Sequence, residues 1–231
     1  MIQSLIRKFI YNCSSKKNAI KISYGITVCN ESDELKKLLK CLTDNIDSND
    51  EIIILSDKAN VTEPVLDIIS DFASRNEYIK HISFPLNSDF SRFKNNLITE
   101  SSGDYLFQID ADEIPNISLL TKIKEFLYIH NNCDCFRIPR VNIVNGISEE
   151  YIKEWNWKID DKNRINYPDL QMRLFKLNKN IIWVNKVHEV LIDYDKVKNL
   201  PHRETEQYCL YHIKEIQKQV KQNDFYNTIS E

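Results

Sequence analysis

The sequence predicts an α/β protein, in which a mostly parallel sheet is flanked by helices and a small mixed part follows near the C-terminus. Segments rich in β-branched and apolar residues alternate with segments whose apolar residues recur every three or four positions. The strand-like segments lack polar alternation, which is typical of strands that are covered on both faces. This alternation stops after Val144, where we expect the mixed part to begin.

The first half of the chain predicts regular elements in sequence. Buried strands are expected at 21–29, 51–55, 78–84 and 104–109. A helix with leucines at helical spacing follows the first strand, and Asn30 is placed to cap it. Thr62 and Pro64 are typical of the start of a second helix. Further helices are expected at 89–100 and 117–129, and a strand at 135–143.

The rest of the chain is less regular. Residues 145–168 are polar and aromatic and predict a long functional loop. Short strands are expected at 170–177 and 181–184, and a long closing helix at 204–226.

Residues 21–231 are expected to form one domain, because no internal repeat or linker divides them. Residues 1–20 form an N-terminal extension with apolar residues at helical spacing beside basic ones. That pattern predicts an amphipathic helix, which either makes peripheral contact with a membrane or packs on its own domain.

Composition excludes several classes of function. The 34 acidic and 31 basic residues leave a net charge of -3, so the general attraction to nucleic acid is missing. The chain has three glycines, which leaves almost none for a Gly-rich phosphate loop. A chain of this size does not need disulfides, so its six cysteines are expected to be reduced, as in the cytoplasm.

An acidic cluster follows the fourth predicted strand. Asp110, Asp112 and Glu113 come directly after the apolar run, and Gly103 precedes that strand. Ligands bind at the carboxyl ends of strands in open α/β sheets. Two carboxylates separated by one residue can share a divalent cation that also holds a diphosphate. The alternative is a solvated acidic turn.

These residues belong to a longer series of motifs. The series comprises Cys29-Asn30-Glu31, Asp57, Lys94-Asn95, Ser102-Gly103-Asp104, Asp110-Ala111-Asp112-Glu113, the run from Asp169 to Phe175, and Val187-His188-Glu189. In this order it resembles family 2 glycosyltransferases, which have the Rossmann-like GT-A fold. There are two departures: Lys94 stands where the family usually has arginine, and residues 58–62 replace a turn rich in glycine and serine.

The resemblance implies roles for individual residues. Residues 21–115 would form the nucleotide-sugar-binding half, and residues 116–231 the acceptor half and closing helix. Donor contacts would come from Thr27, Asn30, Glu31, Asp57, Lys94, Asn95, Asp110, Ala111 and Arg173. Uridine is the favoured base, because a carboxylate at Asp57 accepts the uracil N–H. Arg173 has the alternative of pairing with an acidic neighbour. Ligands for Mn²⁺ or Mg²⁺ would be Asp112, His188 and Asp110.

The catalytic base and the acceptor contacts are less constrained. Asp169 and Glu189 are the candidate bases, with Asp169 favoured, because Glu189 has the alternative role of orienting His188. Trp155, Trp157 and Tyr167 are candidate platforms for a sugar acceptor, or else core aromatics. His212 and Lys214, on the predicted last helix, are within reach of a diphosphate if a loop closes, or else are exposed.

The sequence thus predicts a metal-dependent, inverting glycosyltransferase that moves a sugar from a UDP-sugar to a hydroxyl on a glycan, lipid or protein. Two alternatives remain. One is a noncatalytic glycan-binding or assembly module with the same fold. The other is a sugar nucleotidyltransferase, which the scarcity of glycine disfavours.

Overall fold

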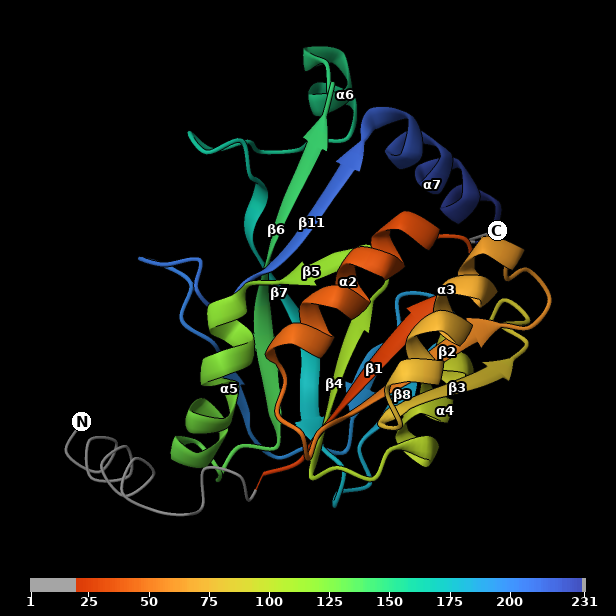
Figure 1. Ribbon diagram of the computed structural model, residues 1–231. Coiled ribbons are helices and arrows are strands. Elements are labelled where there is room, and N and C mark those ends of the chain that lie inside the picture. Colours follow the sequence, from red (N-terminus) through yellow and green to blue (C-terminus); the bar gives the residue numbers. More distant parts are fainter. Residues whose placement is uncertain (1–19, 230–231) are drawn as a thin grey trace.

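The computed structural model describes residues 20–229, and nearly all of the predicted N-terminal amphipathic segment lies outside them. Four parallel strands form one half of the main sheet: β1 (Ile22–Val28), β2 (Glu51–Asp57), β3 (Ile79–Phe84) and β4 (Tyr105–Asp110). They lie in the order β3-β2-β1-β4, so β3 is at the outer edge and β4 adjoins the other half of the sheet (Figure 1). The predicted strands in this half are confirmed.

The other half of the sheet is mixed. It contains β5 (Glu113–Pro115), β6 (Cys135–Asn145), β7 (Ile165–Lys176), β10 (Val197–Asn199) and β11 (Leu210–Glu215). β7 pairs antiparallel with both β4 and β6, while β11 runs parallel to β6. Within the described residues these strands complete a nine-stranded sheet in the order β3-β2-β1-β4-β7-β6-β11-β5, with β10 also beside β6. The predicted α/β class with a mostly parallel sheet is therefore correct.

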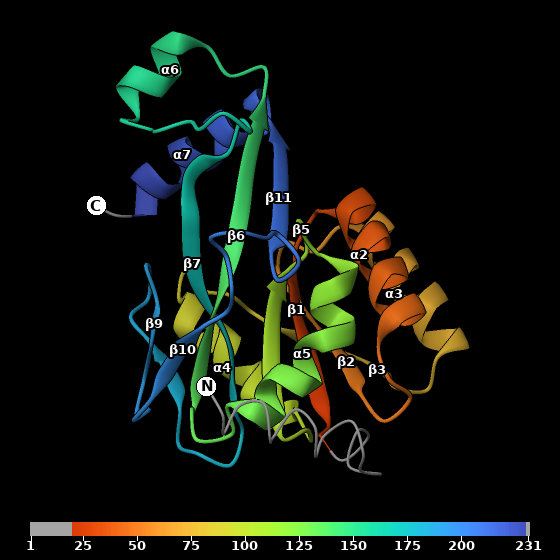
Figure 2. The ribbon, with the colours of Figure 1, turned by 90° about the vertical axis from the view of Figure 1, so that its left-hand side faces the viewer.

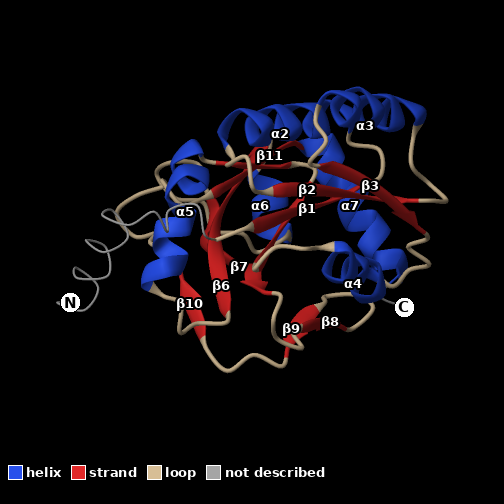
Figure 3. Cartoon of the chain, turned by 60° about the horizontal axis from the view of Figure 1, so that its bottom comes forward, coloured by secondary structure: helices blue, strands red, loops and turns tan. Residues whose placement is uncertain are grey.

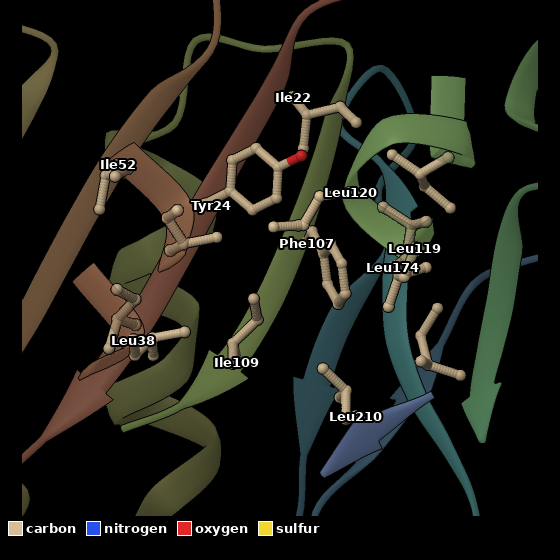
Figure 4. Close-up of a cluster of buried hydrophobic side chains, with 14 of the residues drawn as sticks. Ile22, Tyr24, Leu38, Ile52, Phe107, Ile109, Leu119, Leu120, Leu174 and Leu210 are labelled. Atoms are coloured by element: carbon tan, nitrogen blue, oxygen red, sulfur yellow. The ribbon is translucent and has the colours of Figure 1, made fainter. Parts of the chain in front are cut away.

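Helices cover both faces of the sheet. On one face lie α2 (Ser32–Asn45), α3 (Glu63–Arg75) and α5 (Ile117–Ile129); on the other lie α4 (Phe90–Glu100) and the ribbon of β8 (Ile182–Val184) and β9 (Val190–Ile192) (Figure 3). Alternate residues of each strand therefore enter two different cores. Figure 4 shows the larger core, where the rings of Tyr24 and Phe107 lie near each other and Leu38 of α2 belongs to the same cluster. Phe93, Leu106 and Trp183 belong to the second core.

The N-terminal ends of α5 and α2 are capped in different ways. The α5 cap is Asn116, whose side chain accepts a hydrogen bond from the Ser118 amide at 2.8 Å. Asn30 does not cap α2 as predicted, because Glu31 occupies the cap position. The Glu31 carboxylate instead accepts hydrogen bonds from the amides of Cys29 and Asn30, at 2.9 and 3.0 Å.

The predicted closing helix at 204–226 is wrong in its first part. Residues Leu210–Glu215 form β11, and α7 (Ile216–Ile229) begins only after it. Six residues of β11 pair in register with β6, and Leu210 is fully buried. The open edge of β6 thus outweighs the local helical pattern, which is a tertiary effect. His212 and Lys214 consequently lie on a strand.

The predicted loop at 145–168 is also more ordered than expected. It contains α6 (Glu149–Glu154), and β7 begins at Ile165, five residues before the predicted strand. β6, β7 and β11 extend beyond the rest of the sheet, with α6 at the tip of this extension and α7 near it (Figure 2). The short strand β5 was not predicted.

A glycine substitution tests the contact between β1 and the start of β4. A Cβ at Gly103 would lie 2.8 Å from the Ser23 amide nitrogen and 2.9 Å from the Lys21 carbonyl oxygen, and neither backbone atom can move freely. A Cβ at Gly25 would meet the side chain of Leu106 at 2.9 Å, which can rotate away. We expect Gly103→Ala to lower the free energy of unfolding by about 2 kcal/mol, and Gly25→Ala to lower it less. Urea unfolding measures both, and equal losses would contradict this account.

Candidate active site

A cleft of about 900 Å³ lies at the carboxyl ends of β1, β2 and β4. Its other wall comes from β6, β7 and β11 and from the segment around β8 and β9. Of the predicted residues, the cleft is lined by Thr27, Glu31, Asp57, Lys94, Asp110, Ala111, Asp112, Asp169, Arg173, His188 and Glu189. Parallel strands place their carboxyl ends at one edge, so residues distant in sequence meet there.

Asp110 is held by both halves of the sheet. Its Oδ1 accepts a hydrogen bond from the Thr27 hydroxyl at 2.9 Å, and its Oδ2 accepts one from Arg173 at 2.5 Å. Burial alone would raise the pKa of Asp110, but Arg173 and Lys94 outweigh burial and hold that pKa well below its usual range. Asp110 is therefore a carboxylate whose two oxygens are both engaged within the protein.

Glu113 lies at the centre of a chain of buried charges. Its carboxylate is fully buried and accepts hydrogen bonds from Arg173 at 2.8 Å and from Arg140 at 2.9 Å. Arg173 continues to Asp110, and Arg140 continues to Asp169. The chain of alternating charges thus connects the end of β4 with β7 across the floor of the cleft.

Asp169 is surrounded by hydrogen-bond donors. Its Oδ2 accepts from Arg140 Nε at 2.8 Å and from the Asn142 side chain at 2.9 Å, and its Oδ1 accepts from Gln171 at 2.5 Å. Burial would raise the pKa of Asp169, but the Arg140 charge and these hydrogen bonds lower it overall. Asp169 is therefore ionised at neutral pH and points into the cleft.

Asp112 meets two side chains of β11. The Lys214 ammonium lies 3.0 Å from Asp112 Oδ2, and His212 Nε2 lies 3.4 Å from the same oxygen. Although burial would raise the pKa of Asp112, His212 and Lys214 lower it far below its usual range. Lys214 also donates a hydrogen bond to Gln222 of α7 at 2.7 Å, so the acidic cluster is connected to the last helix.

The second wall of the cleft holds another ion pair. Lys94 of α4 pairs with Glu189, and its ammonium lies 5.0 Å from the centre of the Trp183 ring. Asn95 turns away from this pair, because its side chain exchanges two 2.9 Å hydrogen bonds with the Trp183 backbone. Asn95 therefore fixes β8 and does not line the cleft.

At the end of the cleft predicted to bind the nucleotide base, only some of the predicted residues are in place. Asp57 is buried and accepts hydrogen bonds from the amides of Leu86 and Ala59 and from the Asn60 side chain. Asn30, by contrast, is exposed beside the cleft and does not line it.

The aromatic residues divide between two places. Trp157 lines the cleft, while Trp155 lies between the rings of Trp157 and Tyr151. Tyr167 lies elsewhere: its hydroxyl donates a hydrogen bond to the His202 carbonyl at 2.7 Å, and Arg164 covers its ring.

The predicted metal ligands do not form a cluster. Among the residues that the structure describes, no group of three or more His, Cys, Asp and Glu side chains is arranged to hold a metal ion. His188 is exposed, with a backbone φ of 54°. His212 is the histidine that contacts Asp112.

Comparison with known proteins gives the family. Residues 23–186 match the sequence profile of "Glycosyl transferase family 2". The chain belongs to this glycosyl transferase family. The match ends before β11, so His212 and Lys214 come from outside the matched region.

Curated relatives agree with this family. The chain is 29% identical over 201 residues to the SPbeta prophage-derived glycosyltransferase SunS of Bacillus subtilis (strain 168), and equally to glycosyltransferase SunS of Bacillus phage SPbeta. The matched region covers 84% of this chain but 39% of each relative. The chain thus spans about two fifths of the length of these relatives.

Solved structures agree in fold. S. aureus TarS 1-349 superposes with a TM-score of 0.59 at 15% identity, over 84% of this chain and 60% of that one. The structure of the same protein in complex with UDP-GlcNAc gives the same TM-score. This structural likeness shows that the chain has a GT-A-like fold.

Some site residues were not predicted from the sequence. Arg140 and Asn142, which are separated by Val141 on β6, face the cleft, and Glu113 was noted only as part of the acidic cluster. The alternation in Arg140-Val141-Asn142, which puts the two polar side chains on one face of a strand, was an available signal.

No helix among the described residues is long and apolar enough to cross a membrane. Peripheral contact through the N-terminal extension remains a prediction, because that segment lies outside the described residues.

The lowered pKa values predict how stability depends on pH. Asp110, Asp112 and Asp169 all have lower pKa values in the folded protein than in an unfolded chain. Their stabilisation is present above the unfolded value of about 4 and is lost as the pH falls through the folded values. We expect the free energy of unfolding to decrease below about pH 4, as measured by urea unfolding between pH 7 and pH 3. Asp169→Asn should make this decrease shallower, and a stability that rises with acidification would contradict the assignment.

Proposed function

We propose that this chain transfers a sugar from a UDP-sugar to an acceptor hydroxyl, with inversion at the anomeric carbon. The observation that carries the proposal is the meeting of Asp110, Asp112 and Asp169 in one cleft of a family 2 fold. The UDP-GlcNAc complex of TarS supports a uridine nucleotide as the donor. Because the curated relatives are longer, the acceptor is proposed only as a hydroxyl on a glycan, lipid or protein.

The uracil contact is assigned to Asp57. A carboxylate offers about four acceptor positions. Three are used by the Leu86 amide, the Ala59 amide and the Asn60 side chain, and one is left for the uracil N–H. Thr27 and Glu31 line the same end of the cleft and are proposed to contact the nucleoside.

We assign a divalent cation, Mn²⁺ or Mg²⁺, to Asp112 and His212. Asn142 Oδ1 lies 2.8 Å from His212 Nδ1, and His212 Nε2 faces Asp112 Oδ2 at 3.4 Å. An imidazole nitrogen and a carboxylate oxygen placed in this way would suit two ligands of one divalent cation. Asp110 fits this role less well, because both its oxygens are engaged. When bound, the cation would neutralise charge on the departing diphosphate.

The remaining groups have separate roles. Lys214 is proposed to move from Asp112 to a phosphate oxygen, which would relieve its repulsion from the cation. His188 lies across the cleft as an alternative cation ligand. The Lys94–Glu189 pair beside Trp183 is proposed to contact the donor sugar and its phosphates.

Asp169 is proposed as the base. Its lowered pKa keeps it ionised, and it takes the proton of the acceptor hydroxyl as that oxygen attacks the anomeric carbon. The UDP leaves from the opposite face, so the configuration inverts. Glu189 is the competing candidate, and its pairing with Lys94 places it beside the groups proposed to contact the donor.

Donor binding tests the function itself. Titration calorimetry with UDP should show tighter binding in the presence of Mn²⁺, and Asp112→Asn should remove this gain while the chain stays folded. The rate of UDP release from the UDP-sugar should fall about 100-fold or more. Asp44→Asn, an exposed carboxylate on α2, is the matched control. If UDP fails to bind with or without Mn²⁺, a noncatalytic module is the better description.

A second pair of variants separates the two candidate bases. Asp169→Asn should lower the rate of UDP release by about 100- to 10,000-fold, with little change in UDP affinity measured without Mn²⁺, because a base acts in the chemical step. Glu189→Gln should mainly weaken donor binding, because it removes the partner of Lys94. The reverse pattern would transfer the role of base to Glu189.

A further inference from the structure

One side chain connects the proposed base with the proposed cation site. Asn142 lies on β6, the strand between β7 and β11. It pairs in register with His212 across the parallel ladder, and its side chain also reaches Asp169. Asp169, Asn142, His212 and Asp112 therefore form one continuous row of contacts.

The donors and acceptors in this row are determined by chemistry. An ionised carboxylate can only accept, so Asn142 must present its NH₂ group to Asp169. Its carbonyl oxygen then faces His212 Nδ1 at 2.8 Å, and that nitrogen must carry the hydrogen. In the neutral ring the lone pair is thus on Nε2, the atom that faces Asp112, and a cation can bind between them; a ring with a hydrogen on both nitrogens donates from Nε2 to Asp112 instead.

We propose that Asn142 is a positioning residue that uses the Asp169 carboxylate to hold His212 in its Nδ1–H tautomer, with Nε2 free to bind a cation. The tautomer follows from the hydrogen bonds alone, while its use for a cation and a base rests on the proposed function. The Asn142 amide would then couple the proposed base to the proposed cation site. A substitution of Asp169 would change cation binding at His212 through Asn142.

Asp169 and His212 differ in how much they depend on Asn142 for their hydrogen bonds. Asp169 has other donors, Arg140 and Gln171, so it keeps its place without Asn142. Among the described residues, Asn142 is the hydrogen-bond partner of His212 Nδ1, so the tautomer of His212 depends on Asn142. Removing the Asn142 amide should therefore change His212 more than it changes Asp169.

The tautomer can be measured directly on the full chain labelled with ¹⁵N-histidine. Long-range ¹H–¹⁵N spectra at pH 8 distinguish the two neutral tautomers, and His212→Gln identifies the His212 signals. We expect the Nδ1–H form in the wild type and a mixture of forms in Asn142→Ala. Asn145→Ala is the matched control, because Asn145 also joins β6 to β11, through Glu215, but at the exposed end. An Nε2–H or doubly protonated ring in the wild type, or an unchanged tautomer in Asn142→Ala, would overturn the proposal.

A double-mutant cycle tests the coupling. Asp169→Asn gives Asn142 a partner that can also donate, so the amide is free to turn and His212 loses its fixed tautomer. We expect Mn²⁺ binding, measured by calorimetry with UDP present, to weaken about tenfold in Asp169→Asn. In the Asn142→Ala background the same substitution should have no further effect. Equal losses of Mn²⁺ affinity in both backgrounds would disprove coupling through Asn142. If the wild-type protein binds UDP but no Mn²⁺, the cation site is refuted. The NMR spectra then still decide whether Asn142 fixes the tautomer of His212.

Discussion

The buried chain of charges from Asp110 to Asp169 is the interaction on which the site depends. Glu113, at its centre, has no solvent exposure and must be matched by Arg140 and Arg173. A buried charge without its partner costs about 3–5 kcal/mol. The two arginines therefore have to be present on β6 and β7 to pair with Glu113, the first residue of β5. The same contacts aim Asp110 and Asp169 into the cleft.

The sheet register supplies the geometry that this chain of charges requires. Thr27 pairs with Asp110 across β1 and β4, Arg140 with Asp169 across β6 and β7, and Asn142 with His212 across β6 and β11. Residues directly opposite each other in a sheet place their side chains on the same face. A shift of one residue in any of these pairs would turn the partner away from the cleft.

The antiparallel strand β7 is what joins the two halves. It lies between β4 and β6, so the parallel half that carries the acidic cluster and the extended half that carries Asn142 and His212 share one sheet. This arrangement also creates an open edge of β6, which β11 fills. His212 and Lys214 reach Asp112 only because these residues form a strand and not the helix that the local pattern favours.

The parts of the fold that could be predicted from the sequence are those with local sequence signals. The first four strands and their helices follow from apolar runs and caps, which are local signals and do not depend on which strands pair. Helix 117–129 and the position of Asp110 and Asp112 after a buried strand were predicted on the same grounds. The boundaries after residue 144 were less accurate, because segments such as Leu210–Glu215 carry a mixed apolar and polar pattern, and only pairing with β6 decides that they form a strand.

The sequence by itself determined the α/β class, the family resemblance and the acidic cluster at a strand end. These depend on periodicity and on residues close together in the chain. Only the tertiary structure decided which charges neutralise one another, which histidine faces Asp112, and that Asn95 supports β8 instead of lining the cleft. The physical reason is that such contacts depend on the register of strands distant in sequence, and register is fixed by burial and pairing across the whole sheet.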